Sequence, residues 1–187
     1  MGDEGLEMLG ANVSFLASTG PDEILDRFAD HQMIAEMKKV FFKEDPNALG
    51  HSYAKLIRGP DGRQDLQDVI SLLQREPSTK RALVTLSGHP GGMVPCINAV
   101  QFLVRDHAVQ TMYFARGQDA FRKFYADALC LATMSETVAA ALRLAPGAVQ
   151  GFIGSSHVYR HDIPAIQETL ASAKNYIANH REQGAVA

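Results

Sequence analysis

The fold is decided by the stretch PCINAVQFLV, Pro95–Val104, in which a proline turn leads into a run of β-branched, aromatic and other apolar residues. This composition is typical of a strand. A second strand is expected over Val109–Ala115, after the short polar link RDHA at 105–108. Strands this close in sequence are expected to pair as antiparallel neighbours.

Helical spacing of apolar residues appears on both sides of this pair. The segment 21–37 begins with Pro and acidic residues and predicts a surface helix, and Leu66–Leu73 predicts another. The segment from about Ala120 to Leu144 is apolar nearly all round, which predicts a long buried central helix ended by Pro146-Gly147. A last amphipathic helix is expected over Ile163–His180.

Shorter strands and loops complete the pattern. Strands are expected at Ala82–Ser87, Val149–Ile153 and Val158-Tyr159, and turn-rich loops at Glu44–Tyr53 and Arg58–Arg63. Together with the helices they predict an α+β fold with a mixed, largely antiparallel sheet packed by the central helix.

Composition limits the class of protein. The chain has 187 residues, 46% of them hydrophobic, which is enough for one domain spanning residues 1–187. Its 18 basic and 21 acidic residues give a net charge of −3, so we expect no nucleic-acid or membrane partner. Two cysteines and no secretory signal indicate a cytoplasmic protein without a disulfide framework.

Cys96 is the candidate nucleophile, because a lone cysteine behind a rigid turn can be held ready to attack. A nearby cation such as Arg116 would favour the thiolate. The competing interpretation is a buried structural cysteine. Lys80 and Arg81 form either a solvated strand end or one half of an anion clamp that pairs with Arg116.

Two other motifs do not support a site. His157 and His161 have the i, i+4 spacing of a metal pair, but the residues between them favour a strand and no third ligand follows, so we expect no metal. The glycine-rich segment Gly88–Gly92 lacks the order of a phosphate loop and is interpreted as a connecting turn.

Four blocks, taken in order, resemble thymidylate synthases. That family has a basic pair, then P-C-H with Q-F after it, then R-S-x-D with an Asn eight residues later, then D-x-H-x-Y. The corresponding blocks here are Ser78–Arg81, Pro95-Cys96 with Gln101-Phe102, Arg116–Asp119, and Ser156–Tyr159. Gly50–Lys55 and, more faintly, Val13–Leu16 also resemble family segments.

The resemblance implies chemistry on a nucleoside monophosphate. Cys96 would add to C6 of the pyrimidine and make C5 a nucleophile toward a one-carbon donor, which in this family is 5,10-methylenetetrahydrofolate. Arg116 would hold the 5′-phosphate near the thiolate. Lys80 and Arg81 resemble the basic pair that the partner subunit supplies, which implies a homodimer with shared active sites.

The remaining roles are also implied by the resemblance. Gln101 would support the site from its strand, and Tyr53 would belong to the proton relay. His157 and Tyr159 would bind a sugar hydroxyl, and Asp119 would contact the pterin donor or its water network.

Asp127 falls where the family has the Asn that reads the pyrimidine. An amide serves N3–H and O4 of uracil, whereas a carboxyl group that carries or shares a proton suits N3 and the amine of cytosine. The same exchange distinguishes the cytidylate hydroxymethylase branch, so Asp127 favours CMP or dCMP. The alternative is an ordinary exposed helix aspartate.

Other positions depart from the family. Ala11 stands at the catalytic Glu, Ile97 at the His after the Cys, Gly117 at a phosphate-binding Ser, and Lys123 at a Gly on which the folate packs. The chain has no Trp, and the family segment that closes over folate is not found.

We therefore expect a divergent family member, shortened at both ends, that hydroxymethylates or methylates CMP or dCMP at C5, in nucleotide or antibiotic biosynthesis. One alternative is a pruned member with other chemistry in the same pocket. Another is a non-catalytic nucleotide-binding or partner subunit.

Overall fold

The computed structural model describes residues 5–43, 52–58, 65–86 and 94–184. In chain order the elements are β1 (Leu6–Leu16), α1 (Glu23–Phe28), α2 (His31–Phe42), α3 (Tyr53–Arg58), α4 (Asp65–Arg75), β2 (Leu83–Thr85), β3 (Ile97–Arg105), β4 (Ala108–Asp119), α5 (Phe124–Leu142), β5 (Ala145–Val158), η1 (Arg160–Asp162) and α6 (Ile163–Gly184).

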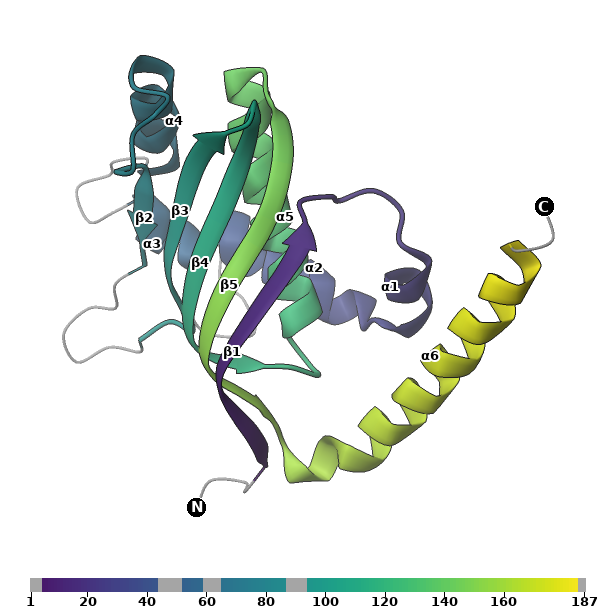
Figure 1. Ribbon diagram of the computed structural model, residues 1–187. Helices are drawn as coiled ribbons and strands as arrows, with labels where there is room; N and C mark the ends of the chain where they lie inside the picture. Colours follow the sequence, from purple (N-terminus) through teal and green to yellow (C-terminus); the bar gives the residue numbers. More distant parts are fainter. Residues whose placement is uncertain (1–4, 44–51, 59–64, 87–93, 185–187) are drawn as a thin grey trace.

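The five strands form one curved sheet in the order β1-β5-β4-β3-β2 (Figure 1). Every neighbouring pair is antiparallel except β4 and β5, which are parallel. The predicted β3–β4 pair is confirmed as a hairpin. Its two turn residues, Asp106 and His107, have φ of 50° and 59°, the left-handed values that a tight hairpin turn requires.

Helix α5 crosses one face of the sheet and closes the core, as predicted. Its inward residues include Leu131, Met134 and Val138, each at most 1% exposed. Inside this interface Thr111 Oγ1 donates to Ser135 Oγ at 2.9 Å. The α+β class, the mixed, mostly antiparallel sheet and the buried central helix are therefore confirmed.

The single helix expected over 21–37 is wrong in extent. Two helices replace it, since the side chain of Asp22 caps α1 and that of Asp30 caps α2. Helix α2 is also not a surface helix throughout, because Met37, Val40 and Phe41 are buried in the core.

The end of α5 and the strands after it also differ from prediction. Arg143, with φ of 57°, ends α5 by a left-handed cap, so Pro146-Gly147 is not the stop. Instead Pro146 lies near the start of β5, which runs unbroken where two short strands were expected. Strand β1 was not predicted, and β2 is shorter than predicted.

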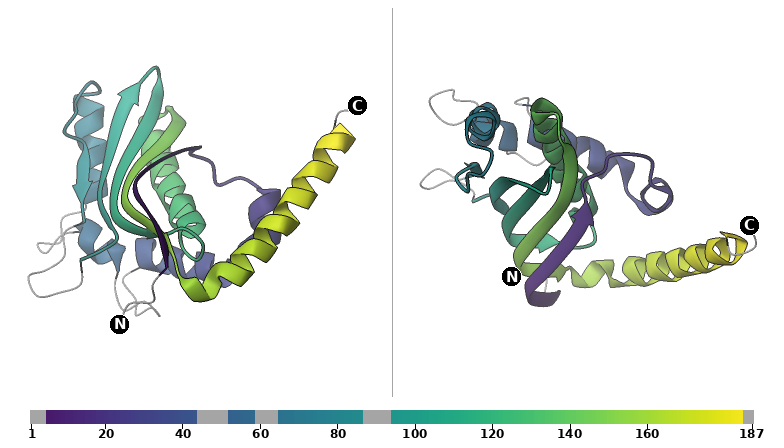
Figure 2. Two further views of the ribbon diagram at one scale, coloured as in Figure 1. Left: turned by 60° about the horizontal axis from the view of Figure 1, so that its bottom comes forward. Right: turned by 45° about the horizontal axis from the view of Figure 1, so that its top comes forward.

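Helices α4 and α6 are confirmed, and Tyr53 begins α3 where a loop was expected. The predicted segments 44–51, 59–63 and 88–92 lie outside the described residues. Figure 2 shows α6 standing off from the sheet beyond β1, where Tyr176 packs on Phe28 of α1 with ring centroids 6.0 Å apart. No described helix is long and apolar enough to cross a membrane.

Candidate active site

One edge of the sheet gathers most of the predicted site residues. The start of β3, the end of β4 and the end of β5 meet there, because β3 is antiparallel to β4 and β4 is parallel to β5. Cys96 immediately precedes β3, and Arg116 and Asp119 lie at the end of β4. His157, at the end of β5, pairs with Asp119. The first turn of α5 brings Asp127 to Gln118 at the end of β4.

Arg116 holds the turn that carries Cys96. Its Nε donates to Pro95 O at 3.1 Å and its second guanidinium nitrogen donates to Val94 O at 2.7 Å. Its backbone N–H donates to Cys96 O at 2.9 Å. Cys96 is a free, half-buried thiol, and Arg116 is exposed, so the guanidinium keeps donors for an anion while it fixes the nucleophile's turn.

Tyr53 reaches the same place from α3. The backbone N–H of Ile97 donates to its hydroxyl at 3.4 Å, and the ring packs edge-on against Phe41 at 4.7 Å. Burial raises the pKa of the Tyr53 hydroxyl, and the negative charges of Asp127 and Cys96 raise it further. The hydroxyl therefore stays protonated and lies within the electrostatic reach of both groups.

Asp127 is buried, at 3% exposure, so the alternative of an exposed helix aspartate is wrong. Gln118 Nε2 donates to its Oδ2 at 2.5 Å. Burial raises the pKa of Asp127 from 3.8 to about 7, against the opposing effects of the Gln118 hydrogen bond and of Lys123. The carboxyl group can therefore carry a proton near neutral pH.

Gln118 is the residue that sequence reasoning missed. It was visible inside the Arg116–Asp119 block, but nothing in the sequence pairs it with a carboxylate nine residues later. Gln118 Oε1 and Asp127 Oδ1 are both buried and have no hydrogen-bond partner among the described residues. Two unpaired acceptors beside each other call for donors.

The residues assigned to the sugar and the donor form a second group. Asp119 Oδ1 accepts from the backbone N–H groups of Phe121, at 3.1 Å, and Arg122, at 2.8 Å. The N–H of Ala120 donates to His157 O at 2.9 Å. The rings of His157 and Tyr159 meet edge to face at 5.5 Å.

The structure does not bring Lys80, Arg81 and Gln101 to this edge within one chain. Gln101 Nε2 donates to Lys80 O at 2.6 Å, so it holds the basic pair and not the Cys96 turn. Arg81 forms an exposed ion pair with Glu76 at 2.6 Å. Since β2 pairs Leu83 with Gln101, the basic pair lies roughly 20 Å along β3 from Cys96, at about 3.3 Å per residue.

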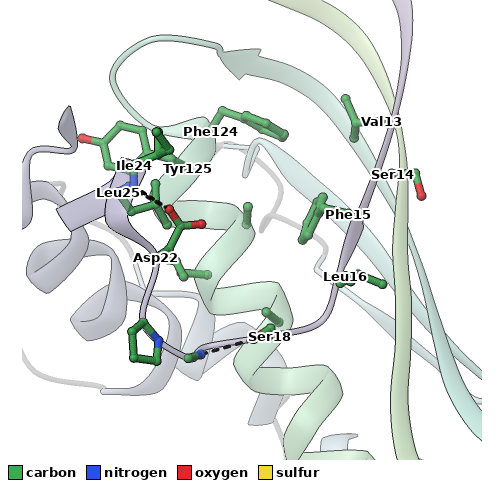
Figure 3. A pocket seen from close by; sticks show the side chains of 15 residues that line it. Val13, Ser14, Phe15, Leu16, Ser18, Asp22, Ile24, Leu25, Phe124 and Tyr125 are labelled. Carbon is green, nitrogen blue, oxygen red and sulfur yellow. Dashed lines mark hydrogen bonds between the residues drawn. The ribbon is translucent and has the colours of Figure 1, made fainter. Parts of the chain in front are cut away.

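An apolar cavity of about 710 Å³ lies elsewhere, between the end of β1, the following loop, α1 and the start of α5 (Figure 3). Phe15, Leu25 and Phe124 line it, and its carboxylate, Asp22, is engaged in capping α1. None of the predicted site residues lines this cavity.

Among the described residues, no group of three His, Cys, Asp or Glu side chains could hold a metal ion.

Known proteins with similar sequences are described as thymidylate synthases. A putative thymidylate synthase of Methanococcoides burtonii is 27% identical over 147 residues, covering 75% of this chain and 68% of the relative. For a putative thymidylate synthase of Methanosarcina barkeri, the matched part covers 64% of that relative's length. The thymidylate synthase of Mycoplasma genitalium is 27% identical over 127 residues, covering 65% of this chain and only 44% of that protein.

The crystal structure of thymidylate synthase from T4 phage superposes with a TM-score of 0.68 at 18% identity, over 88% of this chain and 71% of that one, which shows a shared fold. The family model described as thymidylate synthase matches residues 11–180. The chain belongs to the thymidylate synthase family.

Proposed function

We propose that this protein is a one-carbon transferase acting at C5 of a pyrimidine nucleotide, and specifically that it hydroxymethylates or methylates CMP or dCMP through a Cys96 adduct. The observation that carries the proposal is the buried Asp127, which accepts a hydrogen bond from Gln118 and whose pKa of about 7 lets its carboxyl group carry a proton near neutral pH. Such a group can share a proton with N3 of cytosine through Oδ1, the oxygen that Gln118 leaves without a partner among the described residues.

The chemistry follows from these positions. The Cys96 thiolate forms a bond to C6, and the electron pair of the C5–C6 double bond moves onto C5 and toward N3. A proton supplied by Asp127 at N3 stabilises that charge. C5 then bonds to the one-carbon unit and loses its proton to a base, and the bond between that carbon and the donor would break with release of tetrahydrofolate. For hydroxymethylation, water adds to the carbon and supplies the hydroxyl oxygen. For methylation, the reduced donor would instead supply a hydride and leave as dihydrofolate. The C6–S bond then breaks, which returns the Cys96 thiolate and restores the ring.

Asp119 is the residue that would contact a reduced-folate donor. Its carboxylate is 8% exposed, lies beside His157, and has only Oδ1 committed to hydrogen bonds among the described residues, which fits a contact with a pterin N–H. When bound, 5,10-methylenetetrahydrofolate would supply the one-carbon unit. Tyr53, kept protonated by burial, would carry protons in the relay.

A homodimer with shared sites forms part of the proposal. The sheet face that α5 leaves uncovered carries Phe114 and Phe152, which stack at 5.9 Å although they are 41% and 46% exposed. A second copy would cover these rings. It would also supply Lys80 and Arg81, which lie too far from Cys96 to act in their own chain.

The test is an assay of the purified protein with CMP, dCMP, UMP and dUMP, each with and without 5,10-methylenetetrahydrofolate. The proposal predicts a cytidylate product that has gained CH₂O, or CH₂ for methylation. A nucleotide that stabilises the protein against heat without any product would favour the non-catalytic alternative, since binding at 100 times Kd contributes about 2.7 kcal/mol. Neither product nor stabilisation with any nucleotide would contradict the proposal.

A further inference from the structure

Gln118 and Asp127 form a buried polar pair with a fixed orientation. Gln118 is 2% exposed and Asp127 is 3% exposed. The Gln118 amide nitrogen is committed to Asp127 Oδ2 at 2.5 Å. Turning the amide over would require the carboxyl proton to lie between Asp127 Oδ2 and Gln118 Oε1, which would leave Oδ1 without a proton for a ligand. The hydrogen bond therefore determines which end of the Gln118 amide is left over, and that end is the carbonyl oxygen.

The two atoms left over are Gln118 Oε1 and Asp127 Oδ1. Both are buried, and neither has a hydrogen-bond partner among the described residues. A buried acceptor without a donor is costly and uncommon in native proteins. One proton on Asp127 turns Oδ1 into a donor, and the pair then presents one donor and one acceptor.

This pair lies at the candidate active site. Gln118 follows Arg116 by two residues on β4 and precedes Asp119. The hydroxyl of Tyr53, which accepts from the N–H of Ile97 next to Cys96, is in the electrostatic reach of Asp127. The pair therefore lies at the same end of the sheet as Cys96.

We propose that Gln118 is a specificity-determining residue that, with Asp127, selects 4-amino over 4-oxo pyrimidines. Gln118 Oε1 accepts a hydrogen bond from the exocyclic amine, and the proton on Asp127 Oδ1 is shared with ring N3. In the observed orientation, in which Gln118 Nε2 donates to Asp127 Oδ2, a 4-oxo ring places O4 against Gln118 Oε1, so two acceptors face each other. This inference rests on the proposed function and names how its base is chosen.

The competing account is structural. In it, the proton on Asp127 Oδ1 bonds to Gln118 Oε1 and closes an acid–amide pair that stabilises the fold and reads nothing. The two accounts differ in substrate preference and not in stability, so a loss of stability alone does not separate them.

The experiment compares CMP, UMP and the 2-pyrimidinone nucleotide, which keeps N3 but lacks the 4-amino group. In wild type we expect kcat/KM, or affinity if no turnover is found, to be roughly ten- to a hundredfold lower for the 2-pyrimidinone than for CMP, since a buried acceptor loses its donor. In Gln118→Met, which keeps the length and removes both polar atoms, the two ligands should differ by less than about threefold.

Gln118→Glu is the matched variant. It keeps an oxygen in the place of Oε1. One proton joins the two carboxyl groups in place of the amide N–H, and a second stays on Asp127 Oδ1, so preference for CMP over UMP should be kept. Because the Gln118 hydrogen bond lowers the pKa of Asp127, both variants should move the alkaline limb of the CMP pH profile to higher pH. If the pair is only structural, neither the alkaline limb nor the preference among the nucleotides should change in either variant.

Each outcome decides the inference. Equal use of CMP and the 2-pyrimidinone by wild type overturns it without any variant, so it stays testable even where Gln118→Met does not fold. An unchanged CMP preference in a folded Gln118→Met also overturns it. Failure of the Cys96 chemistry would appear as absent turnover, whereas failure of this inference would appear as an unchanged ratio of affinities.

Discussion

Arg122 and Asp162 form a two-pronged ion pair, with Arg122 Nε 2.7 Å from Asp162 Oδ2 and a terminal guanidinium nitrogen 2.6 Å from Asp162 Oδ1. The same nitrogen lies 2.9 Å from Nε2 of His161, whose ring stacks on Tyr159 at 5.6 Å. The pair thus joins the turn after β4 to the turn after β5, and it sets Tyr159 relative to Asp119.

We predict that Arg122→Lys raises KM for the nucleotide about tenfold with a smaller change in kcat, because an ammonium group does not reproduce the fork. Steady-state kinetics measure the split, and Arg75→Lys, at an exposed end of α4, is the control. Equal KM in Arg122→Lys and Arg75→Lys would count against a positioning role.

The hydrogen bond from Arg122 holds the pKa of Asp162 below its usual range. The stabilising effect of this ion pair is present above pH 4 and is lost as pH falls further.

Asp127→Asn is predicted to shift preference from CMP toward UMP by roughly ten- to a hundredfold in kcat/KM, because an amide has no acid proton to share with N3 of cytosine, whereas its carbonyl can accept from N3–H of uracil. Competition between the two nucleotides in one reaction measures the ratio directly. If wild type uses both equally, or the variant keeps the original preference, Asp127 does not read the base.

The same carboxyl group predicts the pH dependence of stability. The pKa of Asp127 is raised from 3.8 to about 7 in the folded protein, so the folded state binds this proton more tightly than the unfolded state does. Its contribution to stability is fully present below about pH 4 and is lost as pH rises toward 7. Asp127→Asn should therefore gain Tm relative to wild type at pH 8 and not at pH 4, as thermal melts in matched buffers would show.

Phe152→Asp is predicted to convert a dimer to monomers, because it places a charge in the stacked pair on the open sheet face. Sedimentation measures the change, and Leu170→Asp, at an exposed position of α6, is the control.

Mixing Arg81→Ala with Cys96→Ser chains should restore roughly a quarter of wild-type activity, since half of the dimers are mixed and each has one complete site. A monomeric wild type would remove the shared-site proposal.

Local patterning predicted the elements whose signals are strong. The β3–β4 hairpin consists of two apolar runs on either side of a short polar link, and α5 is long and apolar, so both were found. Strand β1 was missed because its first five residues are all exposed at a sheet edge, so the alternation that marks a strand is confined to its second half, where Ala11, Val13 and Phe15 pack against the core. Pro146 was interpreted as a helix stop because a proline is accepted in a strand only at certain positions, such as near its start. Its place near the start of β5 is set by pairing with β4, which the local sequence does not show.

The candidate site shows the same division. Cys96, Arg116, Asp119 and His157 lie in motifs and were found from sequence, and the ends of three strands bring them together. The pairing of Gln118 with Asp127, and of Arg122 with Asp162, depends on how the turn after β4 places α5 and η1. No local sequence signal specifies such contacts.

The central claim is covalent attack by Cys96 at C6 of a cytidylate, and loss of deuterium from C5-labelled CMP tests it most directly. Attack at C6 makes the C5–deuterium bond exchangeable even without a one-carbon donor, whereas binding alone leaves it intact. We predict exchange by wild type and by Cys130→Ala, whose thiol is fully buried, and none by Cys96→Ser. Exchange by Cys96→Ser at the wild-type rate, or none by a wild type that binds CMP, would contradict the account.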